Sequence, residues 1–271
     1  MTVTDLEKFK DRFSEYVRTF YSPEPEEQRN IALKEKHTFQ VCKTIRLLAE
    51  GQPIGRDKIL LAETIGLFHD IGRFPQYARY KTFRDSISVN HGKLGAEILA
   101  EEGLLSGLDA RESGTVINAV RFHNAFIAPL LQDTGDLFFL RLIRDADKLD
   151  IWRIFLDFFE GGEEVQASAA SLGLPDTPGY TDKVLACIHE KKCASHGLLK
   201  NLNDFKLLQL SWVFDVNFRT SFELLREYRY LERLAALLPR TDEVLKASGF
   251  LQDYVRQRAQ ARDESATGCS Q

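Results

Sequence analysis

The sequence Phe68-His69-Asp70-Ile71-Gly72-Arg73 follows the apolar segment 59–62 and organises the rest of the chain. In a helix of about 100° per residue, His69 lies on the same face as Ala62 and Ile65, which is the face expected to be buried. A buried imidazole needs partners for both ring nitrogens, and an adjacent carboxylate needs still more of them. A divalent metal ion meets both needs, because neutral imidazole and ionised carboxylate bind the same kinds of ion.

The composition is that of a globular protein. The 271 residues suffice for one large helical domain, or for one domain with a smaller helical appendage, and 44% of them are hydrophobic. The 36 basic and 40 acidic side chains give a net charge of −4, which argues against a general nucleic-acid binder but allows a nucleotide ligand. No apolar run reaches the roughly 18 residues of a membrane span. The polar start and the four cysteines, which show neither metal-finger spacing nor a disulfide framework, lead us to expect a reducing, cytoplasmic setting.

Apolar residues recur at helical spacing through most of the chain, and no convincing strand alternation is found. The predicted helices span residues 5–20, 25–50, 57–71, 91–102, 111–123, 137–159, 181–191, 204–216, 221–237 and 241–257. Residues 73–90 show little periodicity and are predicted to be a loop, as are residues 172–180. We therefore predict an all-α protein with a helical bundle over residues 1–160, a C-terminal helical extension over 161–257 that packs on the bundle, and a disordered tail over 258–271.

Four histidines lie where aliphatic residues are expected. His37, His69, His91 and His123 each fall on the apolar stripe of a different predicted helix. One such histidine is more often an ordinary core residue, but each of the four carries the cost of burying a polar ring. A shared metal ion or ion pair explains all four with one cause.

A dication site also needs acidic groups, and the candidates lie between Arg144 and Asp150. The apolar stripe of this segment has its centre about 100° from both Asp145 and Asp147, and Asp150 is closer to it. Periodicity therefore leaves the choice among these acidic residues open.

Taken together, these residues resemble the HD superfamily of metal-dependent phosphohydrolases. The family's pattern is an early His, a His-Asp pair and a late Asp, often within Ala-Asp-x-Leu, and the matching residues here are His37, His69-Asp70 and Asp147. Residues 69–72 also match the common HDIG form, with Arg73 where a lysine is frequent. The resemblance covers about residues 30–155 and implies an HD-domain helical bundle with a metal site between its helices, followed by additional C-terminal helices.

His91 and His123 resemble the extra pair of members with two metals, such as cyclic-nucleotide and HD-GYP phosphodiesterases, although no GYP tripeptide is present. The resemblance implies one or two divalent metal ions and favours two, with Mn, Fe, Mg, Co and Ni left open. Asp70 would then bridge the ions. The implied metal ligands are His37, His69 and Asp147 on one ion, His91 and His123 on the other, and Asp70 on both.

The function that the resemblance implies is hydrolysis of a phosphate ester by a metal-activated hydroxide. The expected substrate is a nucleotide or a related small phosphorylated metabolite; neither a membrane nor a long nucleic acid is expected as a partner, and a homodimer stays open. Asp70 and His91 are the predicted catalytic residues, and Arg73, Arg121 and Lys148 the predicted substrate-binding cations. Two alternatives stay open, an HD-type di-iron oxygenase and a non-catalytic nucleotide-sensing module.

Overall fold

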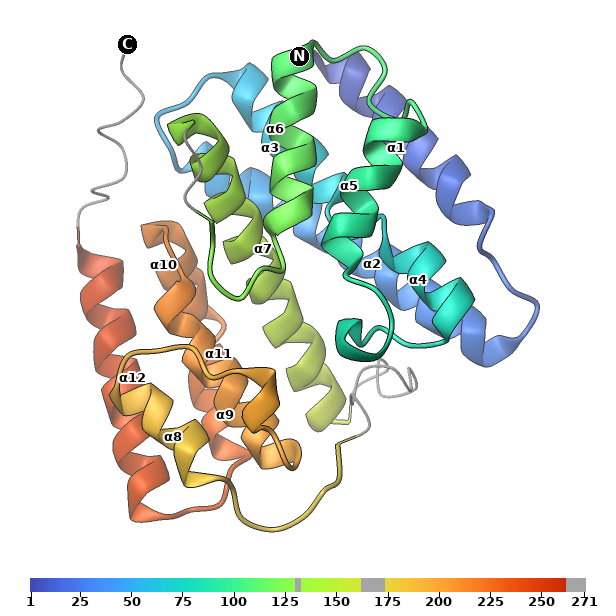
Figure 1. Ribbon diagram of the computed structural model, residues 1–271. Helices are drawn as coiled ribbons and strands as arrows, with labels where there is room; N and C mark the ends of the chain where they lie inside the picture. The colour runs from blue at the N-terminus through green and yellow to red at the C-terminus, as the bar shows by residue number, and fades with distance from the viewer. Residues whose placement is uncertain (130–132, 162–173, 262–271) are drawn as a thin grey trace. The chain divides into compact units, whose positions relative to one another are not determined.

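The computed structural model describes residues 1–129, 133–161 and 174–261, and these residues form helices and connecting segments without a β-strand (Figure 1). The all-α class predicted from the sequence is therefore confirmed. The chain divides into two compact units, of which the first comprises Met1–Asp150 and the second begins at Ile151. The domain boundaries predicted from the sequence stay a prediction.

The first unit contains α1 (Val3–Arg18), α2 (Pro25–Glu50), α3 (Arg56–Phe68), α4 (Arg73–Tyr80), the short 3₁₀ turn η1 (Asp85–Ile87), α5 (His91–Glu101), α6 (Ala110–Phe122) and most of α7 (Thr134–Phe159). Helix α3 contacts both α2 and α6, and α6 contacts α5, so these four helices are successive neighbours in the first unit (Figure 1). Side-chain caps fix the starts of two of them: Asn90 accepts a hydrogen bond from the backbone N–H of Lys93 at the start of α5, and Asp109 does the same for Glu112 at the start of α6.

An aromatic cluster holds the turn between α3 and α4. The ring of Phe68, the last residue of α3, lies edge-on to Phe9 and Phe13 of α1, with centroid distances of 6.2 and 6.3 Å. Phe74, near the start of α4, lies 5.9 Å from Phe13. Buried aromatic side chains contribute much of the packing energy of a core. The cluster therefore fixes both ends of the turn 69–72, which carries the His-Asp pair.

Gly72 allows this turn to lie directly against α5. A Cβ atom at this position would lie 2.3 Å from the carbonyl oxygen of His91 and 2.7 Å from the backbone nitrogen of Gly95. Only glycine fits so close a backbone approach. The contact sets the distance between the His-Asp pair and His91.

The second unit contains the end of α7, α8 (Asp182–His189), α9 (Leu202–Ser211), α10 (Arg219–Glu227), α11 (Tyr230–Ala236), α12 (Asp242–Gln260) and the 3₁₀ turns η4 (His196–Leu198) and η5 (Trp212–Asp215). Its core is rich in aromatic residues: Phe155 lies edge-on to Phe205 at 4.7 Å, and the indole N–H of Trp152 donates to the carbonyl oxygen of Gln209 at 3.1 Å.

The predicted loop over residues 73–90 is wrong in part, because Arg73–Tyr80 form α4 and Asp85–Ile87 form η1. Phe74 and Tyr77 are the buried apolar residues of α4, and one pair at i, i+3 is too short a pattern to recognise. The predicted helix over 221–237 is interrupted at Arg229, which adopts a left-handed φ of 52° between α10 and α11. Helix α12 extends to Gln260, and residues 262–271 of the predicted tail lie outside the described residues.

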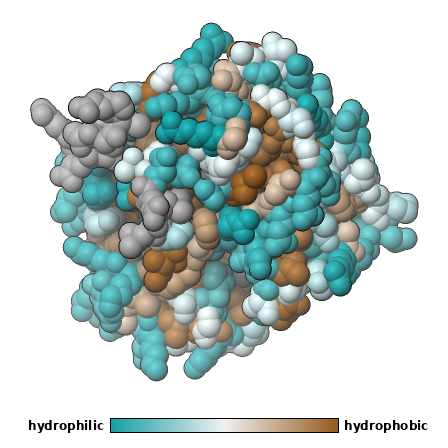
Figure 2. All heavy atoms as spheres, turned by 45° about the horizontal axis from the view of Figure 1, so that its top comes forward, coloured by the Kyte–Doolittle hydropathy of each residue, from teal (hydrophilic) through white to brown (hydrophobic). Residues whose placement is uncertain are grey.

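Hydrophilic side chains cover most of the face shown in Figure 2, with hydrophobic ones gathered in smaller groups. Within the described ranges, no helix combines the length and the apolar character needed to cross a bilayer.

Candidate metal centre

All six metal ligands predicted from the sequence lie in the first unit, two of them in the middle of long helices and four at helix ends or in the adjoining turns. His37 comes from α2, His69 and Asp70 from the turn after α3, and Asp147 from α7; His91 begins α5, and His123 directly follows α6. The four imidazoles and Asp70 are at most 4% exposed. Residues far apart in sequence thus bring five buried polar groups to one place, which requires mutual partners or a bound ion.

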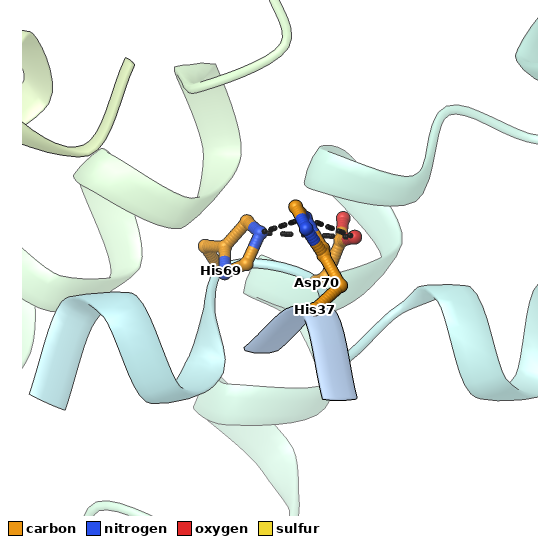
Figure 3. Close-up of side chains that lie close together, drawn as sticks. All are labelled: His37, His69 and Asp70. Atoms are coloured by element: carbon orange, nitrogen blue, oxygen red, sulfur yellow. Dashed lines mark hydrogen bonds and ion pairs between the residues drawn. The ribbon is translucent and has the colours of Figure 1, made fainter. Parts of the chain in front are cut away.

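The first group of side chains contains His37, His69, Asp70 and Asp147. The Nε2 atoms of His37 and His69 lie 3.3 Å apart, and Figure 3 shows both rings turned toward Asp70. Asp70 Oδ2 is 3.6 Å from the first of these nitrogens and 3.7 Å from the second. Asp147 Oδ1 is 3.1 Å from His37 Nε2 and 3.7 Å from His69 Nε2. Two nitrogen and two oxygen atoms therefore converge on one small volume.

The second group contains Asp70, His91 and His123. The Nε2 atoms of the two imidazoles lie 3.0 Å apart. Asp70 Oδ1 is 3.3 Å from Nε2 of His91 and 3.7 Å from Nε2 of His123. Because Oδ2 of the same carboxylate faces the first group, Asp70 lies between the two groups and offers one oxygen to each.

The outward-facing nitrogens show which ring atoms are available for a metal. The Nδ1 atoms of His69 and His123 lie 2.8 and 2.7 Å from the carbonyl oxygens of Gly66 and Val120. A carbonyl can only accept, so both Nδ1 atoms carry the proton, and in the neutral rings Nε2 presents a lone pair to the centre.

The Nδ1 atoms of His37 and His91 face carboxylates instead, Asp150 at 2.6 Å and Asp85 at 2.8 Å. Metal-binding histidines are typically oriented by such outer acceptors. Lone pairs that face each other at 3.0–3.3 Å repel unless a cation lies between them. The side chains present therefore fit a divalent metal ion in each group.

The protonation states agree with this interpretation. Burial and nearby Lys34 act to lower the pKa of His37, but its hydrogen bonds to Asp147 and Asp150 outweigh them and raise the pKa to about 9. Burial would raise the pKa of Asp147, yet its hydrogen bond with the protonated His37 imidazole holds it well below the usual value. In the metal-free protein, a proton on His37 thus occupies the place that the donor set offers to a cation.

The other two shifts favour metal ligation directly. Although burial acts to raise it, the pKa of Asp70 lies well below its usual value, chiefly because the positive charges of Lys34 and Arg73 lie beside the carboxylate. Burial, followed by the charge of Arg73, lowers the pKa of His91 to about 3 against the opposing effect of Asp85. An ionised carboxylate and a neutral imidazole are the forms that bind metal.

The three cations predicted to bind substrate are placed differently. Arg73 lies at the centre: its Nε is 3.5 Å from Asp70 Oδ1, and Nη1 donates to Asp85 Oδ1 at 2.9 Å. Arg121 is a half-buried residue of α6, and the described residues place it in no hydrogen bond or ion pair. Lys148 donates to the carbonyl oxygen of Arg144 at 3.3 Å. A substrate-binding role for each stays a prediction.

Three residues at the centre were not predicted. Lys34 Nζ lies 2.9 Å from Asp70 Oδ2, and its position three residues before His37 on α2 could have indicated it, because residues at i, i+3 share a helix face. For Asp150, helical periodicity offers only an alternative to Asp147. Asp85 lies in a segment without periodicity, so no local pattern pointed to it.

Comparison with protein families identifies the segment that holds this centre. Residues 35–152 match the family model of the HD domain, and all six predicted ligands lie within the match. This part of the chain is therefore similar to an HD domain. Comparison with curated proteins and with solved structures gave no match.

Proposed function

We propose that the chain is a two-metal phosphohydrolase that cleaves a phosphate ester of a nucleotide or a related small phosphorylated metabolite. The observation that supports this most is the position of Asp70, which presents Oδ2 to the nitrogens of His37 and His69 and Oδ1 to those of the second imidazole pair. Two ions held in this way supply an activated water and neutralise the charge of a phosphoryl group.

The protein's own contribution is to bind and orient the phosphate. The side chains of Lys34, Arg73 and Asp147 are 16, 15 and 17% exposed, so the centre is accessible to solvent beside them. Lys34 and Arg73 both face Asp70, and a phosphoryl oxygen that approaches from this side meets their charged groups. Fixed cations of this kind stabilise the charge that spreads over the phosphoryl oxygens in the transition state.

The test combines metal analysis of the purified protein with phosphate release from a panel of nucleotides and sugar phosphates. We expect His69→Ala and Asp70→Ala to remove bound metal and hydrolysis while the helical circular dichroism signal is unchanged. The control is His189→Ala, an exposed histidine at the end of α8, which should alter neither. Unchanged turnover in a metal-free variant would refute the proposal.

The same experiment separates the two other functions that the donor set allows. Imidazole and carboxylate also suit iron, so turnover that requires O₂ and is lost under anaerobic conditions would indicate a di-iron oxygenase. Stoichiometric nucleotide binding without phosphate release would indicate a sensing module.

A further inference from the structure

Asp85 receives more hydrogen bonds than a surface residue of an irregular segment requires. It lies in η1, within the segment of residues 81–90 that connects α4 to α5, and its side chain is 29% exposed. Four side chains approach its two oxygens. They are His91 Nδ1 at 2.8 Å, and Arg73 Nη1, Gln76 Nε2 and Asn124 Nδ2 at 2.9 Å each.

These donors connect the 81–90 segment to the second group of ligands. Gln76 is fully buried on α4 and also donates to the carbonyl oxygen of Val89 at 2.9 Å, so it holds both sides of η1. Asn124 follows His123 directly, and Arg73 approaches Asp70. The carboxylate of Asp85 thus connects the segment and α4 to His91 and to Asn124, the residue after His123.

The first group has a different support. Asp150 approaches His37 Nδ1 at 2.6 Å, but its side chain is only 3% exposed, and it lies on α7 one turn after Asp147, which belongs to the same group. The first group also contains two carboxylates, whereas the second has only the shared Asp70. A group with more anionic ligands on rigid helices binds a divalent ion more tightly than one with fewer ligands and a surface support.

We propose that Asp85 is the positioning residue of the second group, and that it makes the second metal ion the weaker and more exchangeable of the two. Asp85 fixes the ring of His91 and keeps the proton on Nδ1, so that Nε2 faces the metal position. This inference rests on the metal-binding part of the proposed function and adds to it a ranking of the two ions by affinity. Helical residues hold the ligands of the first ion in place, whereas binding of the second ion depends on the conformation of the 81–90 segment.

The test is a titration of metal-free protein with Mn²⁺, followed by calorimetry and by the electron paramagnetic resonance signal of a coupled manganese pair. The wild type is expected to bind two ions with different affinities. Asp85→Asn should leave the tighter ion in place and weaken the other about 10- to 100-fold, with loss of the coupled signal at limiting Mn²⁺. Asp150→Asn, the matched substitution in the first group, should weaken the tighter ion instead. Asp11→Asn, at an exposed position of α1, controls for the change in net charge.

A double-mutant cycle distinguishes positioning from a general structural role. If Asp85 acts through His91, then adding Asp85→Asn to His91→Ala should cause no further loss of Mn²⁺ affinity. A further loss in the double variant, or equal weakening of both ions by Asp85→Asn alone, would overturn the inference. So would a wild type that binds a single ion. If Asp85→Asn fails to fold in thermal melts with EDTA, Asn124→Ala serves instead, because it removes the donor to Asp85 Oδ2, the oxygen that also faces His91 Nδ1. Asn124→Ala should weaken the second ion, and unchanged binding would count against the proposal.

The readout is binding, so the two proposals fail in different ways. If the wild type binds two Mn²⁺ ions and Asp85→Asn loses only the second, but no substrate releases phosphate, then the hydrolase proposal is refuted and the inference about Asp85 stands. If the protein releases phosphate but binds both ions equally well with and without the Asp85 carboxylate, then the inference is refuted and the hydrolase proposal stands.

Discussion

Gly72→Ala tests the close contact between the His-Asp turn and α5. The added Cβ would lie 2.3 Å from the carbonyl oxygen of His91 and 2.7 Å from the backbone nitrogen of Gly95. The two backbones would have to separate by about 1 Å to restore ordinary contact. Overpacking of this kind costs about 1–3 kcal/mol. For a chain of this size we expect the melting temperature to fall by about 2–4 °C for each kcal/mol.

The larger effect should be on the metal centre. His91 begins α5, so a shift of its backbone moves its imidazole away from Asp70, now 3.3 Å from Nε2. A misplacement of about 1 Å at a catalytic centre can lower turnover about 100-fold. We therefore expect weaker binding of the second Mn²⁺ and a loss of phosphate release that exceeds the loss of stability.

Gly114→Ala is the matched control. Gly114 lies inside α6, and an added Cβ there meets no atom within 4 Å. Alanine at an open helical position stabilises by about 0.5–1 kcal/mol, so this variant should melt at or above the wild-type temperature with normal metal content. If Gly72→Ala matches it in calorimetry, in Mn²⁺ titration and in phosphate release, the close contact does not constrain the centre.

Three further perturbations test the centre and its support. Because the pKa of His37 is raised to about 9, a metal ion must displace the His37 proton at neutral pH, and the affinity for the first ion should rise with pH up to about 9. Calorimetry in buffers of different ionisation enthalpy counts the protons released on metal binding. A release of no protons would contradict this prediction. The same shift in the pKa of His37 implies that its proton contributes fully to the free energy of unfolding of the metal-free protein below pH 6.5, and that this contribution is lost as the pH rises through 9. Urea unfolding in EDTA measures this free energy. Phe68→Ala should cost about 3–5 kcal/mol by cavity formation, whereas an equal loss for Phe126→Ala, at an exposed position, would show no special role for the aromatic cluster. EDTA should lower the melting temperature, since ligand at 100 times its Kd stabilises by about 2.7 kcal/mol, and a coincident melt with and without EDTA would exclude metal in the folded protein.

The buried histidines could be recognised from the sequence because each interrupts an apolar helical stripe, and a stripe is a local pattern. The choice among the acidic residues near the end of α7 could not be made in the same way. The structure shows why: Asp147 and Asp150 both contact His37, one through Nε2 at 3.1 Å and the other through Nδ1 at 2.6 Å. Helical periodicity gives the direction in which a side chain leaves the helix axis. It does not tell which nitrogen of a histidine on another helix that side chain contacts.

Asp85 could not be found from the sequence for a related reason. Its partners include Arg73, twelve residues before it, and Asn124, thirty-nine residues after it. Neither relation produces a period, because the contacts form only when α4, α5 and α6 have packed together. Residues that orient metal ligands from irregular segments are therefore the part of such a centre that sequence patterns describe least well.

The two groups of ligands share one local arrangement, and the residue that follows it differs between them. In each group the two histidines are 32 positions apart, and the later one follows a helix directly and bonds to the carbonyl three residues before it. The next residue is Asp70 in the first group and Asn124 in the second. A carboxylate at 124 would lie against Asp85, where the amide now donates at 2.9 Å, and two carboxylates at that distance repel. The amide preserves the outer support of His91, so the second group has no carboxylate of its own and depends on Asp70, which would link the two proposed metal positions through one side chain.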